Sequence, residues 1–381
     1  MPSELAPCPH RPTCPGCPRY GVRALDPRAE SLLFELAARA GVEKPRVHHG
    51  AALGFRARAR LAVRGRASSP KVGIFQTGSH KIADIPRCGI HHPRINEVAA
   101  ALRRAVRETG VTPYAERAQR GALRYLQVAI ERRSGRAQVV LVGHGESPDP
   151  LLPLFARLER ELGDGLQGLF WNGNASPGNA ILGPRWQRIA GADALVEVVD
   201  GVSVFHPPGA FGQSHPELFE SLARAARAAV PQGARVLELY AGTGAIGLGL
   251  LARSASVELN ELAPAGLQGL ELGIAARPEP ERERARLLPG DAASHAPRVA
   301  AADAVVVDPP RRGLDPLVQD ALLAAPPAVL VYVSCGLESL ARESAALLGS
   351  GRFALASLEA WDLFPYTEHV ETLAVFRGVR G

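Results

Sequence analysis

Three of the five cysteines lie within ten positions of one another near the start of the chain. Cys8, Cys14 and Cys17 follow the spacing C-x5-C-x2-C in the stretch CPHRPTCPGCP. Clustered thiols in a chain with so few cysteines favour a metal or an iron–sulfur cluster over disulfides. Three ligands leave such a site one short, so we expect a fourth ligand elsewhere in the sequence.

A glycine-containing turn forms a second candidate site. In VLELYAGTGAIGLGL, residues 236–250, a strand pattern runs into a turn with Gly242 and Gly244 and then into a helix pattern. Glycines let the backbone approach a ligand closely, and a helix N-terminus offers free N–H groups. Alone, such a G-x-G turn is a weak signal, because many turns contain it by chance.

Carboxylates end the next two strand patterns. Glu261 closes SVELNE, where a carboxylate can accept hydrogen bonds from both hydroxyls of a ribose; Glu258 is the alternative within the same strand. Asp291, in LLPGDAAS, ends a third strand, and we expect it to face an adenine. We also place Tyr240, before the glycine turn, among the cofactor contacts. The set fits a nucleoside cofactor, with S-adenosylmethionine as the leading candidate.

Two more candidate residues leave later strands. Asp308, in VVVDPPRRG, follows an apolar strand and precedes two prolines, which hold the chain extended and rigid. A plain capping aspartate is the alternative, but two arginines follow directly. Cys335, in VYVSCG, closes a strand before a helix; a buried core cysteine is the common alternative. At a helix N-terminus we expect a lowered thiol pKa, which favours the nucleophilic thiolate.

The elements that carry these residues divide the chain in two. From about Gly201, short apolar strands alternate with helical stretches, which predicts a doubly wound, mostly parallel sheet with ligands at the carboxyl ends of the strands. The preceding part reads as an α+β region with mostly antiparallel strands. We therefore predict an α/β protein with domains at 1–200 and 201–381.

Charge is distributed unevenly between these parts. Residues 1–150 hold 25 Lys and Arg against 12 Asp and Glu, whereas the rest of the chain holds 19 against 26. In GFRARARLAVRGRA, residues Arg56, Arg58 and Arg60 share one face of a predicted strand, opposite an apolar face. Such a face is either solvated or contacts phosphate, and the basic excess indicates a polyanionic partner.

The first residues of the chain and its hydropathy bear on where in the cell we expect the protein to be. No apolar run approaches the ~20 residues that a membrane span requires, and MPSELAPCPHRP lacks the apolar core of a signal peptide. We expect an intracellular, cytoplasmic protein without a membrane partner.

Taken together, these motifs resemble those of the RNA 5-methyluridine methyltransferases, which use S-adenosylmethionine on uridine in transfer or ribosomal RNA. The resemblance rests on GAFGQSHPELF, DPPRRG, the Ser-Cys pair ending at Cys335, and FPYTEHVE, in that order. RGALRYLQV and NGNASPGNAILG also resemble the family's middle region, so the likeness covers almost the whole chain.

The resemblance implies a role for several of the residues. Cys335 would add to carbon 6 of uracil so that carbon 5 can take the methyl group, and Glu371 would then remove the proton from carbon 5. Phe211 would stack on the extruded base, and Gln213 and Asp308 would hold the uracil edge or the cofactor. The implied substrate is a specific uridine of RNA, most readily 23S ribosomal RNA, or else transfer RNA.

The family often binds a four-iron, four-sulfur cluster through C-x5-C-x2-C and a distant fourth cysteine. Cys88, in IPRCGIHHP, is available at such a distance. The resemblance therefore implies a [4Fe–4S] cluster on Cys8, Cys14, Cys17 and Cys88, and zinc is the alternative on ligand type alone.

Several alternatives stay open. Glu368, three residues before Glu371, is a rival base. His215 stands where the family has asparagine two places after the motif glutamine, and Gly336 follows the nucleophile where asparagine is common. A methyltransferase for an exocyclic base nitrogen would need no Cys335, and a non-catalytic RNA-binding protein would need neither Cys335 nor Glu261.

The sequence also suggests how RNA is bound. The chain starts almost at the cysteine cluster, so we expect it to lack the small β-barrel RNA-binding domain that many relatives carry in front. RNA binding would then come from the basic first half, and we expect a monomer.

Overall fold

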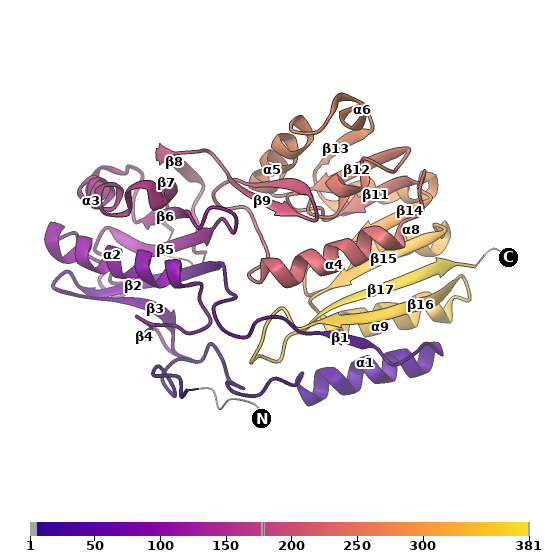
Figure 1. The fold of residues 1–381 in the computed structure, drawn as a ribbon, viewed down its shortest axis with the longest axis horizontal. Helices are drawn as coiled ribbons and strands as arrows, with labels where there is room; N and C mark the ends of the chain where they lie inside the picture. Colours follow the sequence, from indigo (N-terminus) through magenta and orange to yellow (C-terminus); the bar gives the residue numbers. More distant parts are fainter. Residues whose placement is uncertain (1–5, 177, 179, 380–381) are drawn as a thin grey trace. The chain divides into compact units, whose positions relative to one another are not determined.

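The protein is described by a computed structural model over residues 6–176, 178 and 180–379, which form two compact units (Figure 1). Unit 1 comprises Met1–Val22 and Ala51–Glu197, and unit 2 comprises Arg23–Gly50 and Val198–Gly381. The later boundary lies close to the predicted one at 200/201. Residues 23–50 differ from that division, because they belong to unit 2 rather than to the first half.

Unit 2 is built on an eight-stranded sheet in the order β1-β16-β17-β15-β14-β11-β12-β13. From β13 to β15 all neighbours are parallel, and β17 runs antiparallel to both β15 and β16. The chain winds outward from β11 first on one side and then on the other, so the strand order reverses beside β11, where such sheets bind ligands. The strands are β1 (Arg46–His48), β11 (Arg235–Leu239), β12 (Ser256–Glu261), β13 (Ala285–Pro289), β14 (Ala304–Val307), β15 (Val329–Ser334), β16 (Phe353–Trp361) and β17 (Glu371–Gly378).

Helices cover both faces of this sheet, as a doubly wound fold requires. α1, α8 and α9 pack on one face through residues such as Leu33 and Leu340, and α4 and α5 pack on the other through Leu222 and Leu270. Because both faces are covered, β14 and β15 are buried at every position and read as continuous apolar runs. The helices are α1 (Pro27–Ala40), α4 (Pro216–Ala229), α5 (Pro264–Ala275), α6 (Glu279–Arg282), α7 (Ala292–His295), α8 (Pro316–Ala324) and α9 (Leu337–Gly349), with 3-10 turns η3 (Gly247–Leu250) and η4 (Ala296–Ala301).

An early segment of the chain completes this sheet. β1 pairs in parallel with β16, with Arg46 opposite Glu359, and α1 packs beside α9 in the same core. α1 begins at an aspartate cap, Asp26, and ends at Gly41, whose φ of 68° is left-handed. The sequence of residues 29–40 has the periodicity of a helix, but the place of this segment in unit 2 depends on β16, a strand about three hundred residues later.

Unit 1 is a seven-stranded, mostly antiparallel sheet in the order β4-β3-β2-β5-β6-β7-β8, with only β6 and β7 parallel. α2 and α3 cover one face, where Leu61 and Val63 meet Leu102 and Phe155. The opposite face carries a smaller apolar cluster around Tyr125. Its elements are β2 (Arg58–Arg66), β3 (Ser69–Phe75), β4 (Ile82–Asp84), α2 (Pro93–Thr109), β5 (Leu123–Ile130), β6 (Ala137–Gly143), η1 (Asp149–Leu151), α3 (Leu152–Leu162), η2 (Gly163–Gly165), β7 (Leu166–Gly173) and β8 (Arg185–Gly191).

A two-stranded ribbon of β9 (Leu195–Val199) and β10 (Val202–His206) contains the point at which the chain passes from unit 1 to unit 2. Both fold classes predicted from the sequence, a doubly wound sheet and an α+β region, are confirmed. None of the helices in the described ranges is long and apolar enough to cross a membrane.

Candidate active site

The glycine turn lies at the carboxyl end of β11, beside the point of strand reversal. Tyr240, Gly242 and Gly244 all have positive φ, of 62°, 59° and 82°. For Tyr240 this conformation is strained, and its hydroxyl accepts a hydrogen bond from the Asp315 amide at 3.1 Å. The helix predicted after the turn is replaced by the short 3-10 turn η3, since Gly247 and Gly249 interrupt the apolar run.

Glu261 lies directly beside this turn. One oxygen accepts a hydrogen bond from the Gly242 amide at 2.7 Å, and the other accepts from the Leu262 and Ala263 amides at 2.9 and 2.6 Å. The rival Glu258 instead contacts Arg298 at 2.7 Å. The structure therefore brings Glu261, and not Glu258, to the glycine turn.

Asp291 follows β13 and caps α7. Its Oδ1 accepts from both the amide and the hydroxyl of Ser294 at 2.7 Å, and these hydrogen bonds hold the pKa of Asp291 below its ordinary value. The carboxylate is thus fixed at the carboxyl edge of the sheet. Its role toward an adenine stays a prediction.

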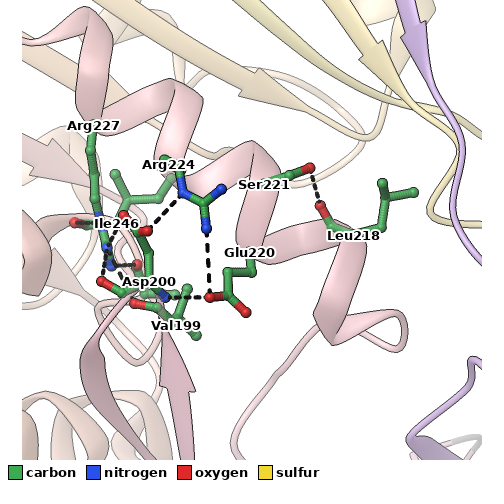
Figure 2. Close-up of polar contacts among 9 residues, drawn as sticks. Val199, Asp200, Leu218, Glu220, Ser221, Arg224, Arg227 and Ile246 are labelled. Atoms are coloured by element: carbon green, nitrogen blue, oxygen red, sulfur yellow. Dashed lines mark hydrogen bonds and ion pairs between the residues drawn. The ribbon is translucent and has the colours of Figure 1, made fainter.

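A buried arginine holds the loop after the glycine turn from behind. Figure 2 shows Arg227 reaching from α4 toward Asp200, Val199 and Ile246. Its Nε donates to the Ile246 carbonyl at 3.1 Å and its Nη2 to the Ala245 carbonyl at 2.6 Å. A third nitrogen, Nη1, contacts Asp200 at 3.3 Å. Because Arg227 joins the β9–β10 turn to the loop, it fixes the loop's backbone.

Glu238 lies one strand position inside this turn. Its side chain is buried, and burial together with the nearby charges of Asp308 and Glu261 raises the pKa of Glu238 to about 8, although Arg227 and the Gly247 amide oppose the shift. A Cβ on Gly247 would lie 2.0 Å from a Glu238 oxygen. The sequence analysis missed this residue because it reads as one more position of an apolar strand.

Asp308, Glu371 and Cys335 come together at the ends of neighbouring strands. Asp308 follows β14, Cys335 follows β15, and Glu371 begins β17, whose next residue pairs with Ser334. Glu371 is fully buried, and neither of its oxygens has a hydrogen-bond partner within the described part of the chain. Burial raises the pKa of both carboxyls, and the charge of Asp308 raises the pKa of Glu371 further, against the opposing charge of Arg311.

The thiol of Cys335 differs from the sequence-based expectation in its acidity. It does precede a helix, because α9 begins at Leu337 with Gly336 as its cap. Burial, followed by the charges of Glu371 and Asp308, nevertheless raises the pKa of Cys335 to about 11. A hydrogen bond and charge from Arg311 act in the opposite direction. The expected lowering was wrong for the resting protein, because burial of the thiol and the two nearby carboxyls outweigh the helix terminus.

Arg311 is the second residue that sequence reasoning did not assign. It follows the two prolines after Asp308, and those prolines return the chain toward Cys335. Two arginines follow the prolines in PPRRG, but this pattern alone does not predict that Arg311 would lie beside Cys335.

The two candidate bases differ in their surroundings. Glu368 is exposed, whereas Glu371 is buried, close enough to Cys335 to raise the pKa of that thiol and close enough to Asp308 for its own pKa to be raised. Phe211 is 69% exposed on the loop between β10 and α4, and Gln213 is half-buried on the same loop. His215, the departure from the family pattern, is buried and caps α4 by accepting from the Leu218 amide at 3.4 Å.

The four clustered cysteines lie in unit 1, where all are half-buried free thiols. Burial and charge on Cys88, Cys14 and Cys8 raise the pKa of Cys17 to about 12, so the four side chains lie within electrostatic reach of one another. His10 accepts from the Arg87 amide at 3.4 Å, which ties the two segments together. Over the ranges described, however, no group of three or more Cys, His, Asp or Glu side chains is already arranged to hold a metal ion.

The arginine-faced strand has the predicted alternation. Ala57, Ala59, Leu61 and Val63 pack into the core beneath α2. Arg56 and Arg58 are half-buried, and Arg60 is exposed, with its Nε donating to Gln127 at 2.7 Å. Burial lowers the pKa of Arg58 to about 10, with Glu197 opposing the shift, so the side chain stays charged at neutral pH. Arg60 is thus the most accessible of the three.

Comparison with solved structures defines the class of fold. The chain superposes with a TM-score of 0.76 on the Pyrococcus abyssi tRNA (uracil-54, C5)-methyltransferase, crystallised with S-adenosyl-L-homocysteine, over 96% of this chain and 86% of that one. At 23% identity this similarity shows the fold alone. The fold is that of a Rossmann-like methyltransferase with a preceding α+β region.

Comparison with protein sequences defines the family. An uncharacterized RNA methyltransferase of Protochlamydia amoebophila is 32% identical over 97% of each chain, and one of Gloeobacter violaceus is 32% identical over 97% of this chain and 82% of its own. The family described as tRNA (Uracil-5-)-methyltransferase matches residues 294–377. The chain belongs to the RNA 5-methyluridine methyltransferase family.

Proposed function

We propose that the protein transfers a methyl group from S-adenosylmethionine to carbon 5 of a uridine in RNA. The observation that carries this proposal is the grouping of Cys335, Asp308 and Glu371 at adjoining strand ends. A nucleophile, a fixed carboxyl and a buried base are the groups that such a reaction requires.

The glycine turn supports a nucleoside cofactor at the same edge of the sheet. Glu261 suits the ribose hydroxyls, because a ligand can replace the backbone amides that its oxygens now accept from. We assign the base of the cofactor to Asp291, which is held at the carboxyl edge as the cap of α7, and the shape of the turn to Tyr240 and Gly242. When bound, S-adenosylmethionine supplies an electrophilic methyl group on a positively charged sulfur.

The chain's own groups then divide the chemistry. The Cys335 sulfur, as thiolate, forms a bond to carbon 6, and the electron pair of the 5,6 double bond moves through carbon 5 toward the methyl group. After carbon 5 has gained the methyl group, Glu371 takes the proton from carbon 5. The electron pair left behind restores the double bond and expels the Cys335 thiolate. Phe211 stacks on the extruded base, and Gln213 and Asp308 hold the uracil edge or the cofactor.

The raised pKa values suit these roles. Glu371 binds a proton more tightly than an ordinary carboxylate, as a base for a carbon-bound proton should. A thiol with a pKa of about 11 is protected from reaction in the resting protein. Bringing Arg311 closer to the sulfur, or neutralising either carboxyl, would favour the thiolate.

RNA containing 5-fluorouridine tests the reaction type. Fluorine at carbon 5 cannot leave as a proton does, so methylated substrate should stay bound to Cys335 as a complex that survives denaturation. A methyltransferase for an exocyclic nitrogen, or a non-catalytic RNA-binding protein, would form no such complex. Formation of product without any adduct would exclude the covalent route.

For the substrate, we propose 23S ribosomal RNA, with transfer RNA as the alternative. Both should be mapped for 5-methyluridine in cells with and without the protein. Loss of the modification from one RNA alone identifies the substrate. We further propose that the protein works as a monomer in the cytoplasm, where thiols stay reduced.

We also propose that Cys8, Cys14, Cys17 and Cys88 hold a [4Fe–4S] cluster, supported by their grouping in unit 1 and by a donor set of four thiols. Protein purified without oxygen should be brown and contain iron and sulfide, and Cys88→Ser should lose both. Stoichiometric zinc without iron would replace the cluster by a zinc site on the same ligands.

A further inference from the structure

A pocket of about 610 Å³ opens in unit 1, apart from the cysteines. It lies beside the apolar cluster around Tyr125, on the sheet face opposite α2 and α3. Its wall includes Phe75, Tyr114 and Tyr125 together with Arg117 and Arg124. The volume is that of an ordinary small-ligand site, and the lining combines aromatic rings with guanidinium groups.

Rings and guanidinium groups alternate in this wall and directly behind it, where Arg64 lies. The Arg64 guanidinium lies 5.4 Å from the Phe75 ring centre and 5.1 Å from that of Tyr125. The Arg124 guanidinium lies 5.9 Å from Tyr125 and 5.0 Å from Tyr114. These five side chains, which we call the aromatic–arginine ladder, hold the two cations in place through cation–π contacts.

A β-bulge aims two consecutive residues at the pocket. Neighbouring residues of a strand normally point to opposite faces, yet Arg124 and Tyr125 both line it. The register between β5 and β6 shifts between Leu123 and Tyr125, which releases Arg124 from the alternation. Bulges of this kind re-aim side chains at functional sites.

Of the two arginines of the ladder, one forms an ion pair with a carboxylate and the other hydrogen-bonds only to carbonyl groups. Arg64 pairs with Glu116 at 2.5 Å, and Glu116 also meets His80 at 3.1 Å. Arg124 is 2% exposed, donates only to the carbonyls of Asn174 and Ser176, and its Nε has no hydrogen-bond partner among the described residues. Such a site favours an electron-rich or anionic ligand.

The rim of the pocket adds accessible polar groups. Arg117 and Gln119 are exposed, and Gln119 has a left-handed φ of 49°. Unit 1 as a whole holds 24 Lys and Arg against 13 Asp and Glu, a net charge of +11. The surroundings therefore attract a polyanion, while the half-buried ring of Phe75 offers a flat surface for stacking.

We propose that this pocket binds one unpaired nucleotide of the RNA, with its base stacked on Phe75 at the end of the aromatic–arginine ladder and its phosphate at Arg117. The proposal rests on the proposed function in so far as RNA is the substrate. It assigns unit 1 a stacking site for a nucleotide other than the methylated uridine. Because every base has a flat face, the site should prefer single strands over duplex without strong preference for sequence.

The test compares the affinity of the full chain for a fluorescent 12-nucleotide single-stranded RNA with its affinity for the same sequence as a duplex. Phe75→Leu combined with Arg117→Gln should weaken single-strand binding by roughly 5- to 100-fold, because one stacked base contributes ~1–3 kcal/mol. Phe75→Tyr, which keeps the ring, should bind as the unchanged protein does. Arg133→Gln removes an exposed charge elsewhere in unit 1 and serves as the matched control.

The outcomes separate this proposal from the proposed function. If the variant that combines Phe75→Leu with Arg117→Gln, the Phe75→Tyr variant and the unchanged protein bound single-stranded RNA with equal affinity, the proposed nucleotide site would be wrong. Methylation could still take place. A protein that binds no RNA at all would instead remove the proposed function itself. Photocrosslinks from 4-thiouridine RNA should fall on the peptides that contain Phe75 or Tyr114, and crosslinks confined to other peptides would also overturn the pocket.

Discussion

The two units bury charge of opposite sign. Unit 2, with 20 Lys and Arg against 25 Asp and Glu, buries the carboxyls of Glu238 and Glu371 at its strand ends and half-buries that of Asp308. Unit 1, net basic, buries the guanidinium groups of Arg64 and Arg124 among aromatic rings. Buried charge is tolerated where a partner offsets it. The acidic site suits a cationic methyl donor, and the basic pocket suits RNA.

The largest expected effect concerns the thiol of unit 2. Cys335→Ala removes the group that adds to carbon 6, so methyl transfer should fall by at least about 1000-fold and no covalent RNA complex should form. Glu371→Gln keeps the thiol but not the base, so a methylated, denaturation-resistant complex should accumulate. Gel analysis with labelled methyl donor measures both.

The matched control for this experiment is Glu368→Gln, which alters an exposed carboxylate three residues away. It should turn over normally. Accumulation of the adduct with Glu368→Gln, together with normal turnover of Glu371→Gln, would exchange the roles of the two residues.

The second prediction concerns stability and pH. The folded state keeps a proton on Glu238 up to pH of about 8, whereas the unfolded chain releases it near 4.5. Its contribution to stability is therefore full below pH 4.5 and is lost as the pH rises through 8. Between pH 5 and 8 the free energy of unfolding should fall by roughly 3 kcal/mol on this account, and Glu238→Gln should flatten the dependence.

Denaturant titrations of the full chain at several pH values measure this slope. Glu271→Gln, at an exposed position of α5, is the control and should leave it unchanged. If the free energy of unfolding of Glu238→Gln fell with pH as steeply as that of the unchanged protein, a group other than Glu238 would cause the pH dependence.

The local motifs of unit 2 could be predicted because each reactive residue directly follows a short apolar strand. Glu261, Asp308 and Cys335 follow such runs, and parallel strands bring their carboxyl ends to one edge. The acidity of Cys335 could not be predicted, because it depends on how deeply Glu371 and Asp308 are buried beside it. A sequence pattern predicts where a residue lies along a strand, but it does not predict how far the folded protein shields the side chain from solvent.

The pocket of unit 1 escaped prediction for a different reason. Its ladder joins Phe75, Tyr114 and Tyr125 from two strands and a loop, and the bulge at Arg124 breaks the alternation from which a face is read. The segment RGALRYLQV was recognised only as a resemblance. Long-range pairing and a register shift are not local properties of the sequence.

A third prediction sharpens the account of the thiol. The charge on Glu371 is one cause of the high pKa of Cys335, so Glu371→Gln should lower that pKa. Without RNA, alkylation of Cys335 by iodoacetamide at pH 8 should become about 3- to 10-fold faster. Peptide mass spectrometry separates Cys335 from the other four thiols. An unchanged rate would leave burial alone as the cause.

The smallest expected effect lies on the arginine-faced strand of unit 1. Arg60→Gln should weaken RNA binding slightly and reduce the slope of log affinity against log salt by about 1, as the loss of one phosphate contact does. Replacing Arg56, Arg58 and Arg60 together should reduce it further, although Arg56 and Arg58 are half-buried. An unchanged slope would mean that this face is only solvated.

The insertion of residues 23–50 into unit 2 affects how the protein is made. β1 pairs with β16, so an early segment of the nascent chain must wait until almost the whole protein has left the ribosome. Unit 1 can collapse first, while the apolar side of α1 stays uncovered and open to chaperones. A fragment starting at residue 198 would lack α1 and β1, and its β16 would present an unpaired edge that invites aggregation.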